Sequence, residues 1–286
     1  MTKLNKAIGF IRLIRPVNCV LMGVGVFVGS ILAGSGVILQ QILSITLGFL
    51  TGFMLTGSTM AINDYYDRGI DAVNEPNRPI PTGLIKPSEA LFFGLMLAAL
   101  GFLTAAITNL QCLFLASLAW AIFVLYTTKG KKMGFIGNVM VSMCISIPFI
   151  YGSFAIERIF TPASCIFVAI VFLSNTGREI AKGIVDLKGD KSNEIQTIAV
   201  KFGATKAAVV SAGFYLTAIS LTSLPWFLGL VSFWFVPLAI ITDIGLASAA
   251  IVLLSKPSRE TVRKIKNQNL FWFFMGLLAF MAGTIP

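Results

Sequence analysis

Long stretches without a charged residue constrain this chain most strongly. No Asp, Glu, Lys or Arg lies between Arg15 and Asp64, between Glu89 and Lys129, or between Lys206 and Asp243. A bilayer-spanning helix needs about 20 mostly apolar residues, so the first two gaps and residues 207–255 are each long enough for two spans. Only 12% of the residues are charged, against about 25% in soluble globular proteins. This pattern excludes a soluble enzyme, a disordered chain and a secreted disulfide scaffold.

The sequence therefore predicts an all-α, polytopic membrane protein with nine transmembrane helices. We expect the spans at residues 10–32, 40–63, 88–108, 112–127, 135–152, 162–182, 205–223, 228–254 and 268–284. The N-terminal region is basic, and the first apolar stretch lacks the small-residue cleavage pattern of a signal peptide. We expect that stretch to be a permanent span.

Lys and Arg are distributed unequally over the loops that join these spans. With nine spans, 21 of the 22 Lys and Arg residues fall on one side, and only Arg158 falls on the other. Because cytoplasmic loops carry an excess of Lys and Arg, we expect a cytoplasmic N-terminus. The net charge of +10 is also compatible with nucleic acid. Cations beside an anionic leaflet explain it better, so no nucleic-acid partner is expected.

The chain has no histidine, and its four cysteines are scattered without a CxxC pair. The lack of His excludes His-ligated haem or zinc and a Ser–His catalytic triad. The cysteines are expected to be small buried hydrophobes. A bound metal would need oxygen ligands, which suits a hard cation such as Mg²⁺.

Acidic residues gather at the ends of two predicted spans. The second span ends in NDYYDRGID, residues 63–71, where Asp64, Asp67 and Asp71 share one helix face by their spacing. The sixth ends in REIAKGIVDLKGD, residues 178–190, where Arg178, Lys182, Asp186 and Asp190 form a stripe at i+4 steps. We call these the first and the second motif.

The motifs could consist of solvated loop charges that close off helices. Carboxylates one turn apart repel each other, however, and the macrodipole at a helix C-terminus disfavours anions. Something cationic must offset both effects. Nearby Lys and Arg could do part of this, and divalent ions are the natural complement.

The two motifs have a similar layout. Each ends an even-numbered span and is followed by a polar loop that reaches a Thr and then a Gly, at Thr82 and Gly83 and at Thr197 and Gly203. We interpret residues 1–286 as one domain with a pseudo-repeat, 1–130 and 131–255, and an added ninth helix, 268–284. Internal repeats in membrane folds commonly build a site where the halves meet, so we expect the motifs to converge on one cavity.

Carboxylates, Mg²⁺ and basic side chains beside an apolar interior would form a clamp for a diphosphate. The metal would neutralise the charge that develops on the departing diphosphate. An allylic tail would leave as a delocalised cation, and a nucleophile would trap it where water is excluded. Repeats and intramembrane acids also suit a transporter, but transporter sites lie more often at the bilayer midplane.

The chain resembles the UbiA superfamily of intramembrane prenyltransferases over essentially its full length. Residues 63–71 look like the first aspartate-rich motif of that family, and Asp186-x-x-x-Asp190 looks like the second. The likeness is strongest to its members in archaeal ether-lipid synthesis, through RPVN at 15–18, NRPIPTG at 77–83, GN at 137–138, PFIYG at 148–152 and REI at 178–180. Gly183 departs from the pattern, because members often carry a further Asp there.

This resemblance implies nine helices around a central cavity, with two Mg²⁺ ions between the motifs and a prenyl diphosphate. It implies catalytic, metal-binding roles for Asp64 and Asp67 at one ion and for Asp186 and Asp190 at the other. Asn63 and the metal-binding Asp71 would support the first ion. Further diphosphate contacts are expected from Asn18, Arg68, Lys129, Arg178, Lys182 and Lys188.

Other polar residues allow two interpretations. Asn18 either binds the diphosphate or packs between helices, and Arg78 either contacts phosphate or braces its own loop. Tyr126, like Tyr65 and Tyr66, either faces an allylic cation or belongs to the interfacial aromatic belt, which we favour. Asp243, deep in the eighth span, is expected to be protonated and hydrogen-bonded to a Ser or Thr of a neighbouring span; the alternative is a functional site.

The implied reaction is Mg²⁺-dependent transfer of a geranylgeranyl group from geranylgeranyl diphosphate to the free hydroxyl of geranylgeranylglyceryl phosphate. Diphosphate is released, and the product belongs to archaeal membrane ether-lipid biosynthesis. The alternative acceptor is aromatic, as in quinone biosynthesis. The expected partners are a prenyl diphosphate donor, a phosphoglyceryl lipid acceptor and membrane lipids. The expected location is the cell membrane, with the active site open to the cytoplasmic side.

Overall fold

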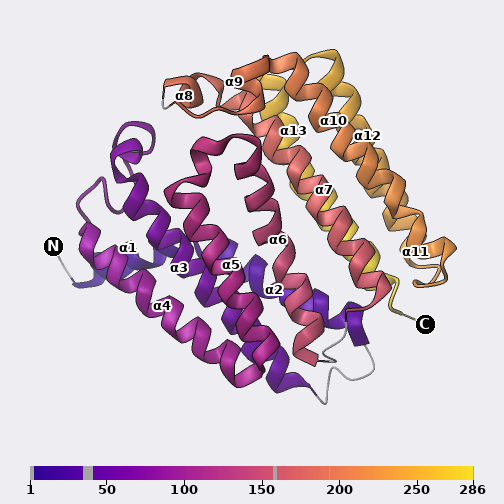
Figure 1. Cartoon of the computed structure of the whole chain (residues 1–286), viewed down its shortest axis with the longest axis horizontal. Helices are drawn as coiled ribbons and strands as arrows, with labels where there is room; N and C mark the ends of the chain where they lie inside the picture. Colours follow the sequence, from indigo (N-terminus) through magenta and orange to yellow (C-terminus); the bar gives the residue numbers. More distant parts are fainter. Residues whose placement is uncertain (1–2, 35–40, 157–159, 193, 286) are drawn as a thin grey trace. The chain divides into compact units, whose positions relative to one another are not determined.

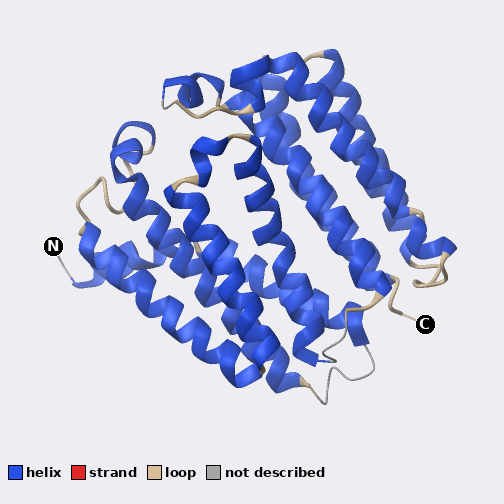
Figure 2. Ribbon diagram, viewed as in Figure 1, coloured by secondary structure: helices blue, strands red, loops and turns tan. Residues whose placement is uncertain are grey.

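The computed structural model describes residues 3–34, 41–156, 160–192 and 194–285, and the elements in these ranges are helices (Figures 1 and 2). They are α1 (Lys3–Ile14), α2 (Pro16–Gly34), α3 (Ile42–Asn74), α4 (Pro87–Thr108), α5 (Leu110–Thr128), η2 (Gly130–Met133), α6 (Phe135–Ile156), α7 (Pro162–Val185), α8 (Leu187–Ser192), α9 (Ile198–Phe202), α10 (Ala204–Thr222), α11 (Leu224–Phe227), α12 (Phe235–Ser255) and α13 (Arg259–Ala282). Within this described part there is no strand, which confirms the predicted all-α class.

Eight helical segments of the described chain are long and apolar enough to cross a membrane. They fall on the first eight predicted spans: Pro16–Gly34, Ile42–Ala72, Pro87–Thr108, Leu110–Thr128, Phe135–Ile156, Pro162–Val185, Ala204–Phe227 and Phe235–Ser255. The ninth predicted span, 268–284, lies on α13. The N-terminal half of that helix is charged, with Arg259, Glu260, Arg263, Lys264 and Lys266.

The first predicted span, 10–32, begins too early. α1 ends at Ile14 and α2 begins at Pro16, because a proline disfavours helical backbone in the residue before it. That residue, Arg15, has a φ of 52°, which lies in the left-handed region that residues other than glycine rarely adopt. The break turns α1 into a separate amphipathic helix ahead of the span.

The first compact unit comprises Met1–Ser30, Gly36–Thr128 and Ile147–Arg158. In it, α3 packs against α1, α4 and α5, and α4 also contacts α5. A small core forms at the C-terminal half of α3 from residues of α1, α3, α4 and the loop between α3 and α4: Leu13, Ala61, Ile80, Ile85 and Ala90. This core holds the loop after the first motif against the helix that carries the motif.

Two glycines let α2 and α6 approach closely within this unit. A Cβ atom on Gly29 would lie 2.1 Å from the carbonyl oxygen of Phe149, and one on Gly152 would lie 2.0 Å from that of Val26. Ser30 donates to the carbonyl oxygen of Gly152 at 3.0 Å across the same contact. Small residues that bring helix backbones together are typical of membrane bundles.

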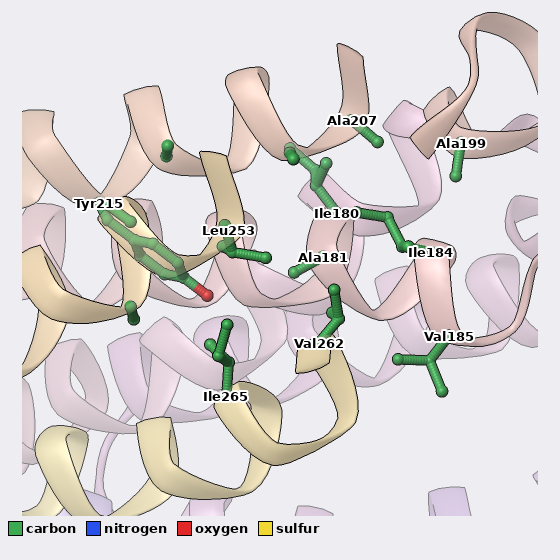
Figure 3. Packing of buried hydrophobic residues seen from close by; sticks show 14 of the residues in the cluster. Ile180, Ala181, Ile184, Val185, Ala199, Ala207, Tyr215, Leu253, Val262 and Ile265 are labelled. Atoms are coloured by element: carbon green, nitrogen blue, oxygen red, sulfur yellow. The ribbon is translucent and has the colours of Figure 1, made fainter. Parts of the chain in front are cut away.

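The second compact unit comprises Ile31–Ser35, Lys129–Ser146 and Ile159–Pro286. Its helices α7, α10, α12 and α13 lie side by side, α10 against α7 and α12, and α13 against α7 and α12 (Figure 1). Figure 3 shows part of the core between them, where Ile180, Ile184 and Tyr215 lie among residues of the other helices. Tyr215 accepts a hydrogen bond on its hydroxyl from Nδ2 of buried Asn269 at 2.7 Å, which links α10 to α13.

Asp243 of α12 has the partner that the sequence predicts. Thr222, the last residue of the neighbouring helix α10, donates from its hydroxyl to Oδ2 of Asp243 at 2.6 Å. The contact lies between two packed helices of the second unit. It agrees with a structural role for this acid.

Candidate active site

The first motif occupies the C-terminal turns of α3. Asp64 and Asp71 are buried, with 3% and 5% of their surface exposed. Asp67 has intermediate exposure and accepts a hydrogen bond on Oδ2 from Nδ2 of Asn63 at 2.8 Å. Because α3 is one helix from Ile42 to Asn74, the i, i+3, i+7 spacing places these carboxylates on one side of it, as predicted.

Two arginines bind the buried carboxylates of this motif. Nη2 of Arg15 lies 2.6 Å from Oδ1 of Asp64. Nη1 of Arg78 lies 3.3 Å from the same oxygen and 2.5 Å from Oδ2 of Asp71. The cations that the crowded acids require are therefore supplied by the break before α2 and by the loop after α3.

The loop that carries Arg78 is fixed by its own backbone. The N–H of Thr82 donates to the carbonyl of Arg78 at 3.1 Å, and the N–H of Ile85 donates to that of Pro79 at 3.0 Å. Gly83 closes the turn at a φ of 72°, where glycine has no Cβ to clash. Arg78 thus links this loop to the first motif through its ion pairs, which agrees with one of its two interpretations.

The second motif contains a helix break that its residue spacing did not predict. α7 ends at Val185, Asp186 caps it, and α8 begins at Leu187, so the predicted stripe of i+4 steps is not one continuous helix. The backbone N–H of Asp190 still donates to the carbonyl of Asp186 at 2.8 Å. The two acids thus remain one turn apart across the break.

The carboxyl group of Asp190 sits in an unfavourable place for a charge. Burial, together with the nearby carboxylate of Asp186, raises the pKa of Asp190 from its ordinary 3.8 to about 6. Lys182 and a side-chain hydrogen bond with Thr197 act in the opposite direction. A cation bound at this acid would relieve the cost of ionising it.

Glu179 engages the two predicted phosphate-binding residues of α7. Nη1 of Arg178 lies 3.2 Å from Oε1 of Glu179, and Nζ of Lys182 lies 3.6 Å from its Oε2. Nε of Arg178 also donates to the carbonyl of Lys266 on α13 at 3.4 Å. Glu179 was not among the predicted site residues, although its place beside Arg178 and three residues before Lys182 was a signal for ion pairing.

The remaining predicted contacts lie at helix ends or on exposed faces. Asn18 is exposed in the first turn of α2, and Lys129 is exposed just before η2. Arg68 donates to the carbonyl of Tyr65 at 2.7 Å and lies 4.7 Å above that ring. Tyr126 packs near Phe123, with ring centroids 6.1 Å apart. The side chain of Lys188 lies outside the described residues.

The donor chemistry fits Mg²⁺, which prefers carboxylate and water oxygens. Among the described residues, no three acidic or Cys side chains form a cluster that could hold a metal ion. Each motif offers two or three carboxylates, and Asp64 and Asp71 are bound to guanidinium groups. An ion at Asp64 would have to displace or join these arginines. Oxygens from a diphosphate or water could complete its ligands.

Known proteins match this chain along nearly all of its length. The family model described as the UbiA prenyltransferase family matches residues 22–278. The chain belongs to this family. The resemblance seen in the two motifs is thereby confirmed, and the chain is a multi-pass membrane protein of prenyltransferase type.

Curated archaeal relatives share about a third of their residues with this chain. A digeranylgeranylglyceryl phosphate synthase of Archaeoglobus fulgidus is 33% identical over 278 residues, which is 95% of this chain and 94% of the relative. That of Methanopyrus kandleri is 34% identical over 278 residues, 96% of this chain and 99% of the relative.

Solved structures have the same fold. One described as concerning digeranylgeranylglyceryl phosphate synthase in membranes matches with a TM-score of 0.84 at 31% identity, over 98% of this chain and 99% of the other. A UbiA homologue from Archaeoglobus fulgidus bound to GPP and Mg²⁺ matches with a TM-score of 0.69 at 16% identity, over 95% of this chain and 99% of the other. The second likeness concerns the fold alone.

Proposed function

We propose that this chain transfers a geranylgeranyl group from geranylgeranyl diphosphate to the free hydroxyl of geranylgeranylglyceryl phosphate and releases diphosphate. The observation that carries this proposal is the identity of 33% and 34% over nearly the whole chain with relatives named digeranylgeranylglyceryl phosphate synthase. The product would serve archaeal membrane ether-lipid biosynthesis. The membrane-embedded helices suit a reaction in which both substrates carry long apolar tails.

The proposal includes the arrangement of the chain in the membrane. We place nine spans around a central cavity, with α13 supplying the ninth, and the N-terminus and active site on the cytoplasmic side. The bias of Lys and Arg supports this orientation. Residues 1–286 would form one domain in which 1–130 and 131–255 are related repeats.

In the proposed site, the two motifs together hold Mg²⁺, with two ions in all. Asp64, Asp67 and Asp71 would serve one ion, and Asp186 and Asp190 the other. Mg²⁺, when bound, supplies positive charge to the diphosphate as it departs. Support comes from the all-oxygen donor set, and from the raised pKa of Asp190, which a cation would offset.

The basic and amide side chains would orient the donor. Asn18, Asn63, Arg68, Lys129, Arg178, Lys182 and Lys188 would contact the diphosphate, and Tyr126 is assigned to the donor as the alternative to a place in the interfacial aromatic belt. The apolar helices would exclude water, so that the acceptor hydroxyl and not water captures the cation. The bond between the allylic carbon and the diphosphate oxygen would break, and a bond between that carbon and the acceptor oxygen would form. The hydroxyl proton would pass to the released diphosphate.

A prenyl transfer to an aromatic acceptor is the second candidate, because the two aspartate-rich motifs would serve the donor diphosphate and do not themselves select the acceptor. An assay of purified protein with geranylgeranyl diphosphate and a panel of phosphoglyceryl and aromatic acceptors separates the two. We expect product and diphosphate only with the phosphoglyceryl acceptor, and loss of both with EDTA or with Asp64→Ala. Product from aromatic acceptors alone would overturn the lipid assignment.

A control variant excludes general damage to the protein. Asp243→Asn removes an intramembrane acid outside both motifs while keeping an acceptor for Thr222, so it should retain activity. Transport of an allylic diphosphate without its cleavage would indicate a carrier instead.

A further inference from the structure

A small polar cavity lies beside the first motif, within the first compact unit. Its volume is about 170 Å³. It is lined from four places in the chain: Arg12 on α1, Arg15 at the break before α2, Asp64 on α3, and Glu75, Asn77, Arg78 and Pro79 after α3. Three arginines from separate segments therefore converge on one hollow.

Each of these guanidinium groups is held in position by a bond to the protein. Nη2 of Arg12 donates to the carbonyl of Asn77 at 2.8 Å. Arg15 and Arg78 are held by Asp64 and Asp71. A guanidinium carries five N–H donors, and these bonds engage one nitrogen of each arginine. Other donors remain at each group for a ligand in the cavity.

The charge and size of the cavity indicate what it can hold. Three arginines line the cavity beside two carboxylates, those of Asp64 and Glu75. Because Arg78 is also paired with Asp71, the arginine N–H donors, and not a surplus charge, would recognise a ligand. Planar guanidinium groups match phosphate oxygens in pairs. The cavity is several times the roughly 30 Å³ that one water occupies in the liquid. A phosphate group therefore fits, but a long isoprenoid chain does not.

The cavity also lies at the ends of two candidate membrane spans. Arg15 directly precedes the span Pro16–Gly34, and Asp64 and Glu75 lie near the C-terminal end of the span Ile42–Ala72. α1, which carries Arg12, precedes the spans and exposes Ile8 and Ile11 beside its charged residues. Such an amphipathic helix is typical of a membrane interface. A lipid phosphate would reach the cavity from this level while its tail stays in the bilayer.

We propose that this cavity binds the phosphate group of the lipid acceptor, and that Arg12, Arg15 and Arg78 set the preference for a phosphorylated acceptor. The proposal rests on the proposed function. A glycerol backbone has three carbons, so the acceptor hydroxyl is only a few bonds from the phosphate. A phosphate held beside Asp64 would bring that hydroxyl next to the site where the donor diphosphate departs.

Arg12→Ala tests the proposal with little risk to the fold. Arg12 is exposed and binds a backbone carbonyl, whereas Arg15 and Arg78 compensate buried acids. Lys6→Ala is the matched control, because Lys6 is on the same helix, carries the same charge and pairs with Glu89 outside this cavity. Arg12→Lys restores the charge without the planar fork and should recover part of the effect.

Steady-state kinetics should separate the two phosphate-bearing substrates. We expect Arg12→Ala to raise KM for geranylgeranylglyceryl phosphate about tenfold or more, because the variant loses a hydrogen bond to a charged group. KM for geranylgeranyl diphosphate should not change. The preference over dephosphorylated geranylgeranylglycerol should fall by the same factor, and Lys6→Ala should behave as wild type. A rise in donor KM alone would assign the cavity to the donor diphosphate and overturn the proposal.

Binding of a soluble probe tests the cavity independently of the reaction. In EDTA, glycerol 1-phosphate should bind the wild-type protein and the Lys6→Ala variant with equal affinity. Its affinity for the Arg12→Ala variant should be about tenfold lower. Equal binding to all three proteins would overturn the proposal. A wild-type protein that binds the probe but does not prenylate the phosphorylated acceptor would refute the proposed function and leave the phosphate site supported.

Discussion

Two arginines decide the electrostatics of the first motif. Asp64 and Asp71 are almost fully buried, and a buried charge is costly unless it is paired. Arg78 contacts both carboxylates, and Arg15 contacts the same oxygen of Asp64 as Arg78 does. The arginines that compensate the acids also line the adjacent cavity, so the stability and the ligand preference of this region depend on the same side chains.

Arg78→Ala should destabilise the protein because it leaves Asp71 buried without its cation. Removing one partner of a buried pair typically costs about 3 kcal/mol or more. Thermal unfolding in detergent should show a lowered Tm, which Arg78→Lys partly restores. Lys264→Ala, which breaks a pair whose side chains are 73% and 82% exposed, should leave Tm unchanged. Equal Tm values for Arg78→Ala and Lys264→Ala would contradict the buried pairing.

Asp190 should make the metal-free protein less stable as the pH rises. Its folded pKa, about 6, is above its ordinary 3.8, so between these values the folded state holds a proton that the unfolded state has lost. The free energy of unfolding therefore falls as the pH rises from about 4 to about 6, and it stays lower above that. Unfolding midpoints in EDTA across this range should show a smaller fall for Asp190→Asn than for wild type. Parallel curves for the two proteins would contradict the raised pKa.

The ion-pair partners of the acidic residues could not be predicted from the sequence. The acids of both motifs stood out by their spacing, but their partners did not. Arg15 is 49 residues from Asp64 along the chain, and only the fold brings them together. Arg78 and Glu179 were visible in the quoted stretches, yet the partner that each would choose depends on packing that no local pattern records.

At the scale of elements, eight of the nine predicted spans fall in order on apolar helices of the described chain, while several of their ends differ from the prediction. α3 continues to Asn74, eleven residues beyond the predicted end at 63, because the motif is itself helical. α12 begins at Phe235 and not at 228, because the short helix α11 and a turn at Gly229, φ 64°, come first. Hydropathy marks the apolar part of a helix, whereas polar turns that extend it carry no such signal.

The contact between α2 and α6 should depend on its glycines. In Gly29→Ala the added Cβ would lie 2.1 Å from a backbone oxygen of Phe149, so the helices must separate. We expect a loss of about 2 kcal/mol or more, seen as a lower Tm in detergent. Gly213→Ala on α10 is the control: its Cβ would meet no atom within 4 Å, and alanine favours helix. It should leave Tm unchanged or raise it. Equal effects of the two substitutions would refute this close approach.

At the scale of the whole molecule, the distribution of charged and apolar residues along the chain determined the predicted fold class. It predicted a helical membrane protein, and the two acidic motifs pointed to its family. The meeting of the motifs is a longer-range property. Asp64 belongs to the first compact unit and Asp186 to the second, and 122 residues separate them in the sequence. Their cooperation in binding Mg²⁺ stays a prediction. It requires carboxylates of both compact units to reach the same bound diphosphate.

A crystal structure of the protein grown with Mn²⁺ and an unreactive thio-analogue of geranylgeranyl diphosphate tests this cooperation most directly, because Mn²⁺ is located by its anomalous signal. We predict two metal peaks beside the diphosphate, one bound by Asp64 and Asp67 and the other by Asp186 and Asp190. Metal at one motif only, or motifs that face separate solvent regions with the diphosphate elsewhere, would contradict the proposed mechanism.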